Sequence, residues 1–305
     1  MAARVAERES QIVLGLDPDP SALWPVAEDE AARAGEPRER AARAVVSHCR
    51  AAIDATAPAC VAVKLQLARF ELLGAPGWSA LETVAADARE HGLLVIADGK
   101  RGDIDVSARA YAGALFGGAQ TPFGELPGLG ADLATVNPLM GVDALEPFVS
   151  AARAAGAGVL VLVRTSNPGA RDVEDVRIEG GGGSLWELIA SIVDEFAAGG
   201  VGESGLSDVG AVVGATAPGH VGRARELMGH SPFLLPGIGA QGGRVEEVAA
   251  AFAPGRAAGL VTASRSIVGA YLTAGGEPAD AARAEAERLR EAAWTLSIGA
   301  AANVR

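Results

Sequence analysis

The chain has 305 residues, 49% of them hydrophobic, and this length and composition suffice to bury a large core. Its formal net charge is −12 and its basic residues form no block, which argues against nucleic acid or an anionic membrane as a partner. No apolar run approaches the roughly 18 residues of a membrane-spanning helix, and MAARVAERES at the start lacks the apolar core of a signal peptide. We therefore expect a cytoplasmic protein, in which Cys49 and Cys60 are free and buried thiols.

Short apolar runs bounded by glycine, proline or polar residues are typical of strands that are buried on both faces. The chain contains about eight of them, at residues 12–17, 60–66, 93–100, 133–138, 158–165, 209–216, 232–239 and 256–264. Helical stretches separate these runs, and two of the helices are predicted to begin with a capping box, at Ser79–Glu82 and Ser184–Glu187. The Ala-, Glu- and Arg-rich tail at 277–297 predicts a last helix.

Alternation of strands and helices predicts a parallel sheet, and about eight such units predict a closed (β/α)8 barrel, the TIM barrel. We expect residues 1–305 to form one α/β domain of this kind, with loop insertions near 18–40, 117–130 and 166–184. A doubly wound open sheet is the alternative, but GLDPDP after the first strand lacks the dinucleotide-binding fingerprint of that fold. Polar residues gather where strands end, on the catalytic face of a barrel: Asp17, Lys64, Asp98, Lys100, Asn137, Arg164, Thr165 and Arg265.

The most informative stretch is residues 93–112, in which a buried strand ends in Asp98, Lys100 and Asp103 with glycines between them. Side chains alternate along a strand, so Asp98 and Lys100 lie on one face, where their desolvation is costly unless they pair. A structural ion pair is the simpler interpretation, but the second carboxylate and the glycines favour chemistry. Lys64 interrupts the neighbouring apolar strand, and Asp98 is its natural partner.

The last two predicted strands supply a candidate phosphate site. The segment PGIGAQGG places glycines around Gln241, and Arg265 opens a helix after the final strand. Backbone N–H groups at a helix start, with an arginine beside them, suit a phosphate dianion, and barrels often bind phosphate after strands seven and eight. A glycine-rich turn with a surface arginine is the simpler alternative.

The carboxylates at the strand ends are possible metal ligands, but the lysines compete for them. Asp17, which follows the first strand, either caps the next helix or joins Asp98 and Asp103 at the site. The four histidines show no spacing suited to a metal. Flanking carboxylates also keep Lys100 an ammonium, which suits it to donate a proton or stabilise a carbanion and not to form a Schiff base. We therefore expect neither a metal nor a cofactor.

Six motifs together resemble the orotidine 5′-monophosphate decarboxylases, in particular their longer bacterial subgroup: VKLQ, DGKRGDI, TVNPLMG, VLVRTSNPG, PGIGAQGG and SRSI. The resemblance covers nearly the whole chain, from Asp17 to about Arg265. It implies a catalytic network made of Lys64, Asp98, Lys100 and Asp103. It further implies substrate contacts to the ribose, the pyrimidine and the phosphate, made respectively by Asp17, by Ser166, and by Gln241 with Arg265.

The same resemblance implies a homodimer with shared active sites. Asp103, and a hydroxyl residue four positions later, are then supplied by the neighbouring subunit. That hydroxyl residue is Ser107 here, where threonine is usual, and Gly99 replaces the more common alanine. The expected contact of this position is with the 2′-hydroxyl of the substrate.

The implied reaction converts orotidine 5′-monophosphate to uridine 5′-monophosphate and CO2, the last step of de novo pyrimidine synthesis, without a cofactor. Lys100 would stabilise the carbanion at C6 and then protonate it. Two alternatives stay open at this point. One is a Mg²⁺-dependent phosphosugar decarboxylase or phosphohexulose synthase sharing D-x-K-x-x-D, and the other is a non-catalytic, phosphate-binding barrel that acts as a regulator.

Overall fold

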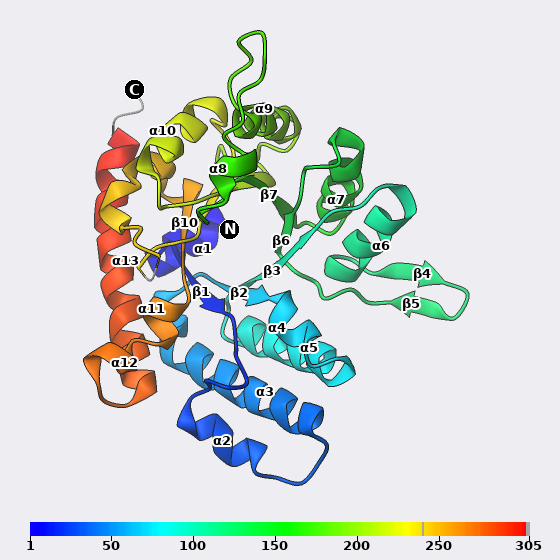
Figure 1. The fold of residues 1–305 in the computed structure, drawn as a ribbon, viewed down its shortest axis with the longest axis vertical. Coiled ribbons are helices and arrows are strands. Elements are labelled where there is room, and N and C mark those ends of the chain that lie inside the picture. The colour runs from blue at the N-terminus through cyan, green and yellow to red at the C-terminus, as the bar shows by residue number, and fades with distance from the viewer. Residues whose placement is uncertain (240, 303–305) are drawn as a thin grey trace.

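The computed structural model describes residues 1–239 and 241–302, and its parallel strands close into a barrel (Figure 1). The order around the barrel is β1-β10-β9-β8-β7-β6-β3-β2, and β1 pairs with both β2 and β10. The predicted (β/α)8 barrel is therefore confirmed, and the open sheet is wrong. The strand bounds are β1 Ile12–Leu16, β2 Ala62–Gln66, β3 Leu94–Arg101, β6 Leu133–Val136, β7 Gly158–Arg164, β8 Val209–Val213, β9 Phe233–Leu235 and β10 Gly259–Ala263.

Helices cover the outside of the barrel (Figure 1). Their bounds are α2 Pro25–Ala31, α3 Pro37–Thr56, α4 Leu67–Glu71, α5 Ala75–Glu90, α6 Asp105–Leu115, α7 Val142–Ala154, α8 Ala170–Val173, α9 Leu185–Ala198, α10 Pro218–Leu227, α11 Arg265–Val268, α12 Tyr271–Ala274 and α13 Pro278–Ala302. Short 3-10 helices complete the set: η1 Ala57–Ala59, η2 Val245–Glu247, η3 Ala249–Phe252 and η4 Arg256–Ala258. Among the helices described, none has the length and apolarity needed to cross a membrane.

The core has two layers, because every barrel strand buries both of its faces. The inner layer fills the barrel with side chains such as Val13, Ile96, Leu160 and Leu234. The outer layer packs the strands against the helices, and it contains the two cysteines, which are free and buried as predicted. A filled interior leaves the strand ends as the place for a site.

An N-terminal helix that the sequence did not predict, α1 Ala2–Arg8, packs at the amino end of the barrel. Its Val5 is 1% exposed and belongs to the inner layer. Arg8 ties the end of the helix down by donating hydrogen bonds to the carbonyl oxygens of Ala57, Cys60 and His91. The helix thereby covers the end of the barrel that is opposite the predicted site.

The three predicted insertions contain some regular structure. Residues 18–40 include α2, and residues 166–184 include α8. Residues 117–130, expected to be a loop, form an antiparallel hairpin of β4 Ala119–Thr121 and β5 Gly124–Leu126. This hairpin extends away from the barrel beside α6 (Figure 1).

Of the two predicted capping boxes, one is confirmed and the other is wrong. Ser184 and Glu187 exchange the expected hydrogen bonds at the start of α9. Ser79, in contrast, lies inside α5, which begins at Ala75. Pro76 occupies the first turn of that helix, where its missing N–H and fixed φ are tolerated, so the helix starts earlier than the Ser-x-x-Glu pattern indicates.

Candidate active site

A cavity of about 380 Å³ opens at the carboxyl ends of the barrel strands. The predicted site residues that line it are Asp17, Lys64, Asp98, Lys100, Ser166, Gln241 and Arg265. Its apolar wall includes Leu162, Val212 and Leu234, and its further polar lining includes Gln66, Thr135 and Thr262. Two predicted residues, Asp103 and Ser107, do not line it.

Asp98 is the centre of the polar cluster in this cavity. Strand pairing places Asp98 on β3 opposite Gln66 on β2, and Lys64 lies two residues earlier on the same face of β2. Lys64 Nζ donates to Asp98 Oδ2 at 2.7 Å, and Gln66 Nε2 donates to the same oxygen at 3.3 Å. Lys100 Nζ donates to the other oxygen, Oδ1, at 2.6 Å. One carboxylate thus joins two ammonium groups from adjacent strands, as the sequence predicted for Lys64 and Asp98.

Electrostatics keep this buried cluster ionised. Desolvation by itself lowers the pKa of Lys64, but the carboxylates of Asp98 and Asp17 outweigh it, so this pKa lies above its ordinary value. Desolvation also raises the pKa of Asp98, yet the ammonium groups of Lys64 and Lys100 outweigh it and hold the pKa at about 2. Both partners are therefore charged at neutral pH, which satisfies the requirement that buried charges be paired.

Lys100 differs from Lys64 in exposure and in backbone conformation. Its side chain is 43% exposed, against 7% for that of Lys64. Its φ is 48°, in the left-handed region that residues other than glycine seldom adopt. The pairing of β3 with β6 shifts register between Ala97 and Arg101, so Lys100 lies in a bulge. Bulges re-aim side chains near active sites, and this one presents the Lys100 ammonium to the cavity.

Asp17 lines the cavity and does not cap a helix. The next helix along the chain, α2, begins only at Pro25. Asp17 Oδ1 instead accepts a hydrogen bond of 3.4 Å from Lys64 Nζ, and its side chain is 35% exposed at the cavity. Of the two interpretations that the sequence left open, the capping role is therefore wrong.

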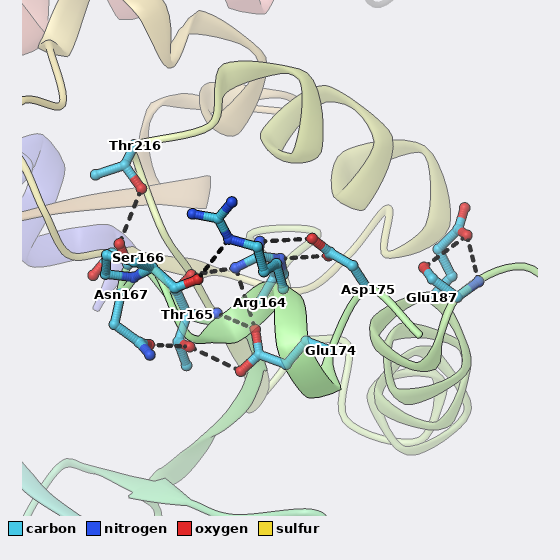
Figure 2. A network of polar contacts seen from close by, with 11 residues as sticks. Arg164, Thr165, Ser166, Asn167, Glu174, Asp175, Glu187 and Thr216 are labelled. Atoms are coloured by element: carbon cyan, nitrogen blue, oxygen red, sulfur yellow. Dashed lines mark hydrogen bonds and ion pairs between the residues drawn. The ribbon is translucent and has the colours of Figure 1, made fainter. Parts of the chain in front are cut away.

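Ser166 follows β7 and begins a loop that a polar network holds in place (Figure 2). Arg164, at the end of β7, binds both oxygens of Asp175 at 2.8 and 3.0 Å, and Glu174 accepts hydrogen bonds from the N–H and the hydroxyl of Thr165. The Arg164 hydrogen bonds lower the pKa of Asp175. These contacts join the end of β7, just before Ser166, to Glu174 and Asp175, which follow it in the loop.

A glycine-rich turn and an arginine form a further part of the cavity wall. Gly237 has φ 100° and Gly239 has φ 75°, conformations that favour glycine, and this turn presents Gln241 to the cavity. Arg265 begins α11 and lines the same cavity. Its guanidinium forms no ion pair or hydrogen bond with any residue that the structure describes. A cation that has no partner among the described residues and lies beside a glycine-rich turn is suited to an anionic ligand.

Asp103 and Ser107 lie outside the cavity of their own chain. Asp103 Oδ1 accepts a hydrogen bond of 2.8 Å from the backbone N–H of Ile104, and Ser107 is exposed on α6. The segment around them carries exposed apolar side chains, with Ile104 52% and Val106 68% exposed.

Several polar residues that line the cavity were not predicted as site residues, among them Gln66 and Thr135. Gln66 is part of VKLQ and lies two residues after Lys64, so strand alternation already placed it on the same face. Thr135 on β6 donates to Asp98 Oδ1 at 2.9 Å, and nothing in LATVNP distinguishes it from an ordinary strand threonine. Within residues 1–239 and 241–302, no group of three or more His, Cys, Asp and Glu side chains is arranged to hold a metal ion.

Comparison with known proteins gives a family for this geometry. The model of the orotidine 5′-phosphate decarboxylase / HUMPS family matches residues 10–284. The orotidine 5′-phosphate decarboxylase of Deinococcus radiodurans is 40% identical over 264 residues, which are 87% of this chain and 86% of that protein.

Solved structures agree. The OMP decarboxylase of Leishmania donovani superposes with a TM-score of 0.71 and 29% identity, covering 97% of this chain and 98% of that one. The UMP synthase of the same organism gives a TM-score of 0.72 and 30% identity, and the match covers 97% of this chain but 56% of that longer one. The resemblance seen in the motifs is confirmed, and the chain belongs to the orotidine 5′-phosphate decarboxylase / HUMPS family.

Proposed function

We propose that this chain converts orotidine 5′-monophosphate to uridine 5′-monophosphate and CO2 in the de novo synthesis of pyrimidines. The observation that carries the proposal is the Lys100 ammonium in the cavity, 2.6 Å from Asp98, whose other oxygen binds Lys64. The family and the activity named for the Deinococcus relative supply the substrate. A cytoplasmic location belongs to the same proposal and is supported by the free, buried Cys49 and Cys60.

In the proposed reaction the bond between C6 of the pyrimidine and its carboxylate carbon breaks. The electron pair stays on C6 while CO2 leaves. The Lys100 ammonium stabilises this carbanion and then transfers a proton from Nζ to C6, after which the neutral amine regains a proton from water. The Asp98 carboxylate stays ionised with a pKa of about 2, because the ammonium groups of Lys64 and Lys100 outweigh its desolvation, and its Oδ1 holds the Lys100 ammonium in place at 2.6 Å.

The remaining predicted residues have substrate-binding roles in this proposal. Asp17 contacts the ribose, Ser166 the pyrimidine, and Gln241 with Arg265 the phosphate. Their arrangement around one cavity, with Arg265 beside the glycine-rich turn, supports these assignments. A phosphate held far from C6 supplies binding energy that the enzyme uses at the reacting carbon.

We further propose a homodimer in which Asp103 and Ser107 complete the cavity of the partner subunit. Both lie outside the cavity of their own chain, although the family motif assigns them to the site. Exposed apolar residues lie beside them in the chain and after β6, namely Ile104, Val106, Leu139, Met140 and Val142. Exposed large apolar side chains in such number are typical of an interface, which supports the dimer.

The direct test of the proposed function follows the ultraviolet absorbance of orotidine 5′-monophosphate with the purified protein. We expect conversion to uridine 5′-monophosphate, with turnover unchanged after exhaustive chelation and dialysis, because an ammonium performs the charge stabilisation in this mechanism. The matched control is the chelated and dialysed protein assayed again after Mg²⁺ has been added back. Turnover that chelation abolishes and Mg²⁺ restores would move the assignment to a metal-dependent reaction.

Replacing Arg265 with alanine is expected to weaken the binding of uridine 5′-monophosphate by roughly 10- to 150-fold. This range corresponds to the free energy of about 1.5–3 kcal/mol that a charge-assisted hydrogen bond contributes. Binding of uridine, which has no phosphate, is expected to change little. Calorimetry with both compounds measures the difference. Arg244→Ala is the control, because Arg244 is exposed, pairs with Glu246 at 3.6 Å and does not line the cavity. Equal losses for nucleotide and nucleoside would show that Arg265 does not bind the phosphate.

A further inference from the structure

We propose that Thr135 is a positioning residue for Lys100, an inference that rests on the proposed function for its kinetic consequence. Thr135 lies on β6 and is 1% exposed, and its hydroxyl both accepts and donates a hydrogen bond. Its Oγ1 accepts a hydrogen bond of 2.9 Å from the backbone N–H of Lys100. The same hydroxyl donates to Asp98 Oδ1 at 2.9 Å, the oxygen that accepts the Lys100 ammonium.

The bulge in β3 explains why a side chain is needed here. On one side of the bulge Ala97 pairs with Ala134, and on the other Arg101 pairs with Val136. Residues 98–100 of β3 therefore lie opposite the single residue Thr135. The regular ladder has no carbonyl left over for the N–H of Lys100, and the threonine hydroxyl takes that place.

The left-handed conformation of Lys100 makes this contact matter. A φ of 48° is unfavourable for lysine and persists only where surrounding contacts hold it. The ammonium of Lys100 binds Asp98, and its side chain is 43% exposed, so packing restrains it little. Thr135 therefore holds Lys100 at two points, at the backbone directly and at the ammonium through Asp98.

The test compares Thr135→Val, which keeps the shape but loses the hydroxyl, with Thr135→Ser, which keeps the hydroxyl. For Thr135→Val we expect kcat to fall by about 10- to 100-fold, the usual effect of a lost polar contact and a slightly misplaced catalytic group. KM and the affinity for uridine 5′-monophosphate are expected to stay within about threefold, because the contacts of Thr135 do not reach the Arg265 side of the cavity. Thr135→Ser is expected to restore kcat to within about threefold of the parent.

Hydrogen exchange of the Lys100 backbone amide supplies a readout that does not depend on activity. Exchange of this amide is expected to be at least about tenfold faster in Thr135→Val than in the parent, and the parental rate is expected to be restored in Thr135→Ser. Thr56→Val is the matched control, because Thr56 is also fully buried and donates to Ala52 O at 2.8 Å, but it lies in α3 outside the cavity. It is expected to leave both kcat and Lys100 exchange unchanged.

The outcomes separate the two proposals. A parent that does not decarboxylate the nucleotide overturns the proposed function, while amide exchange still decides whether Thr135 holds Lys100. If the parent is active, an unchanged kcat and an unchanged exchange rate in Thr135→Val overturn the positioning role alone. A loss of kcat in Thr135→Val that Thr135→Ser shares would also overturn it, since the hydroxyl would then not be the cause.

Discussion

Lys100→Ala is expected to lower kcat by several orders of magnitude while the chain stays folded. Stabilisation of the carbanion and donation of the proton are together worth roughly 4–8 kcal/mol, or about 10³- to 10⁶-fold in rate. The fold is expected to persist because Asp98 keeps its contacts with Lys64, Gln66 and Thr135, so that no buried charge is left unpaired. Single-turnover absorbance measurements give the rate of decarboxylation, and circular dichroism shows whether the variant is folded.

Arg50→Ala is the matched control for this variant. It also removes a cation that pairs with a carboxylate, Asp87, but the pair is exposed and lies outside the cavity. Exposed pairs contribute little to stability, so both kcat and folding are expected to be unchanged. Decarboxylation by Lys100→Ala at more than a tenth of the parental rate would mean that Lys100 has only a structural role.

The second large effect is the recovery of activity on mixing two inactive variants, Lys100→Ala and Asp103→Ala. If each site combines Lys100 of one chain with Asp103 of the other, a mixed dimer has one site with both defects and one intact site. Random exchange makes about half of all dimers mixed, so roughly a quarter of the parental activity is expected to return. The decarboxylation assay after subunit exchange measures this recovery.

Two controls make that experiment decisive. Each variant alone, taken through the same exchange procedure, must stay inactive, and native mass spectrometry must detect mixed dimers. If mixed dimers form and no activity returns, Asp103 acts within its own subunit. If the protein is a monomer at assay concentrations, no partner subunit can supply Asp103, and the shared site is wrong.

The barrel and most of the cavity could be predicted because their signals are local in the sequence. Each strand is a short apolar run, and the polar residues follow directly where it ends, as Asp17 follows β1 and Asp98 lies near the end of β3. In a parallel barrel those ends meet at one face, so order along the chain is sufficient to bring the residues together.

Other features could not be predicted because they depend on contacts between distant segments. The β4–β5 hairpin has three-residue strands with little burial, so it carries no alternation of apolar and polar residues. Helix α1 buries only Val5. It packs against the open end of a barrel whose strands come from residues far along the chain, so its position has no local signal. Thr135 acquires its role from a bulge in another strand, which no pattern in β6 itself reveals.

The helix at the amino end of the barrel has a consequence for how products leave. Val5 covers that end, and Val13, Ile96 and Leu160 fill the interior, so the described side chains close the barrel on the side away from the cavity. In the proposed reaction, substrate entry, the escape of CO2 and the release of the nucleotide would then share the mouth of the cavity. A segment that covers this opening would retain the gas and the nucleotide together, so the lifetime of the covered state would set the time available for CO2 to recombine with the carbanion before Lys100 protonates it.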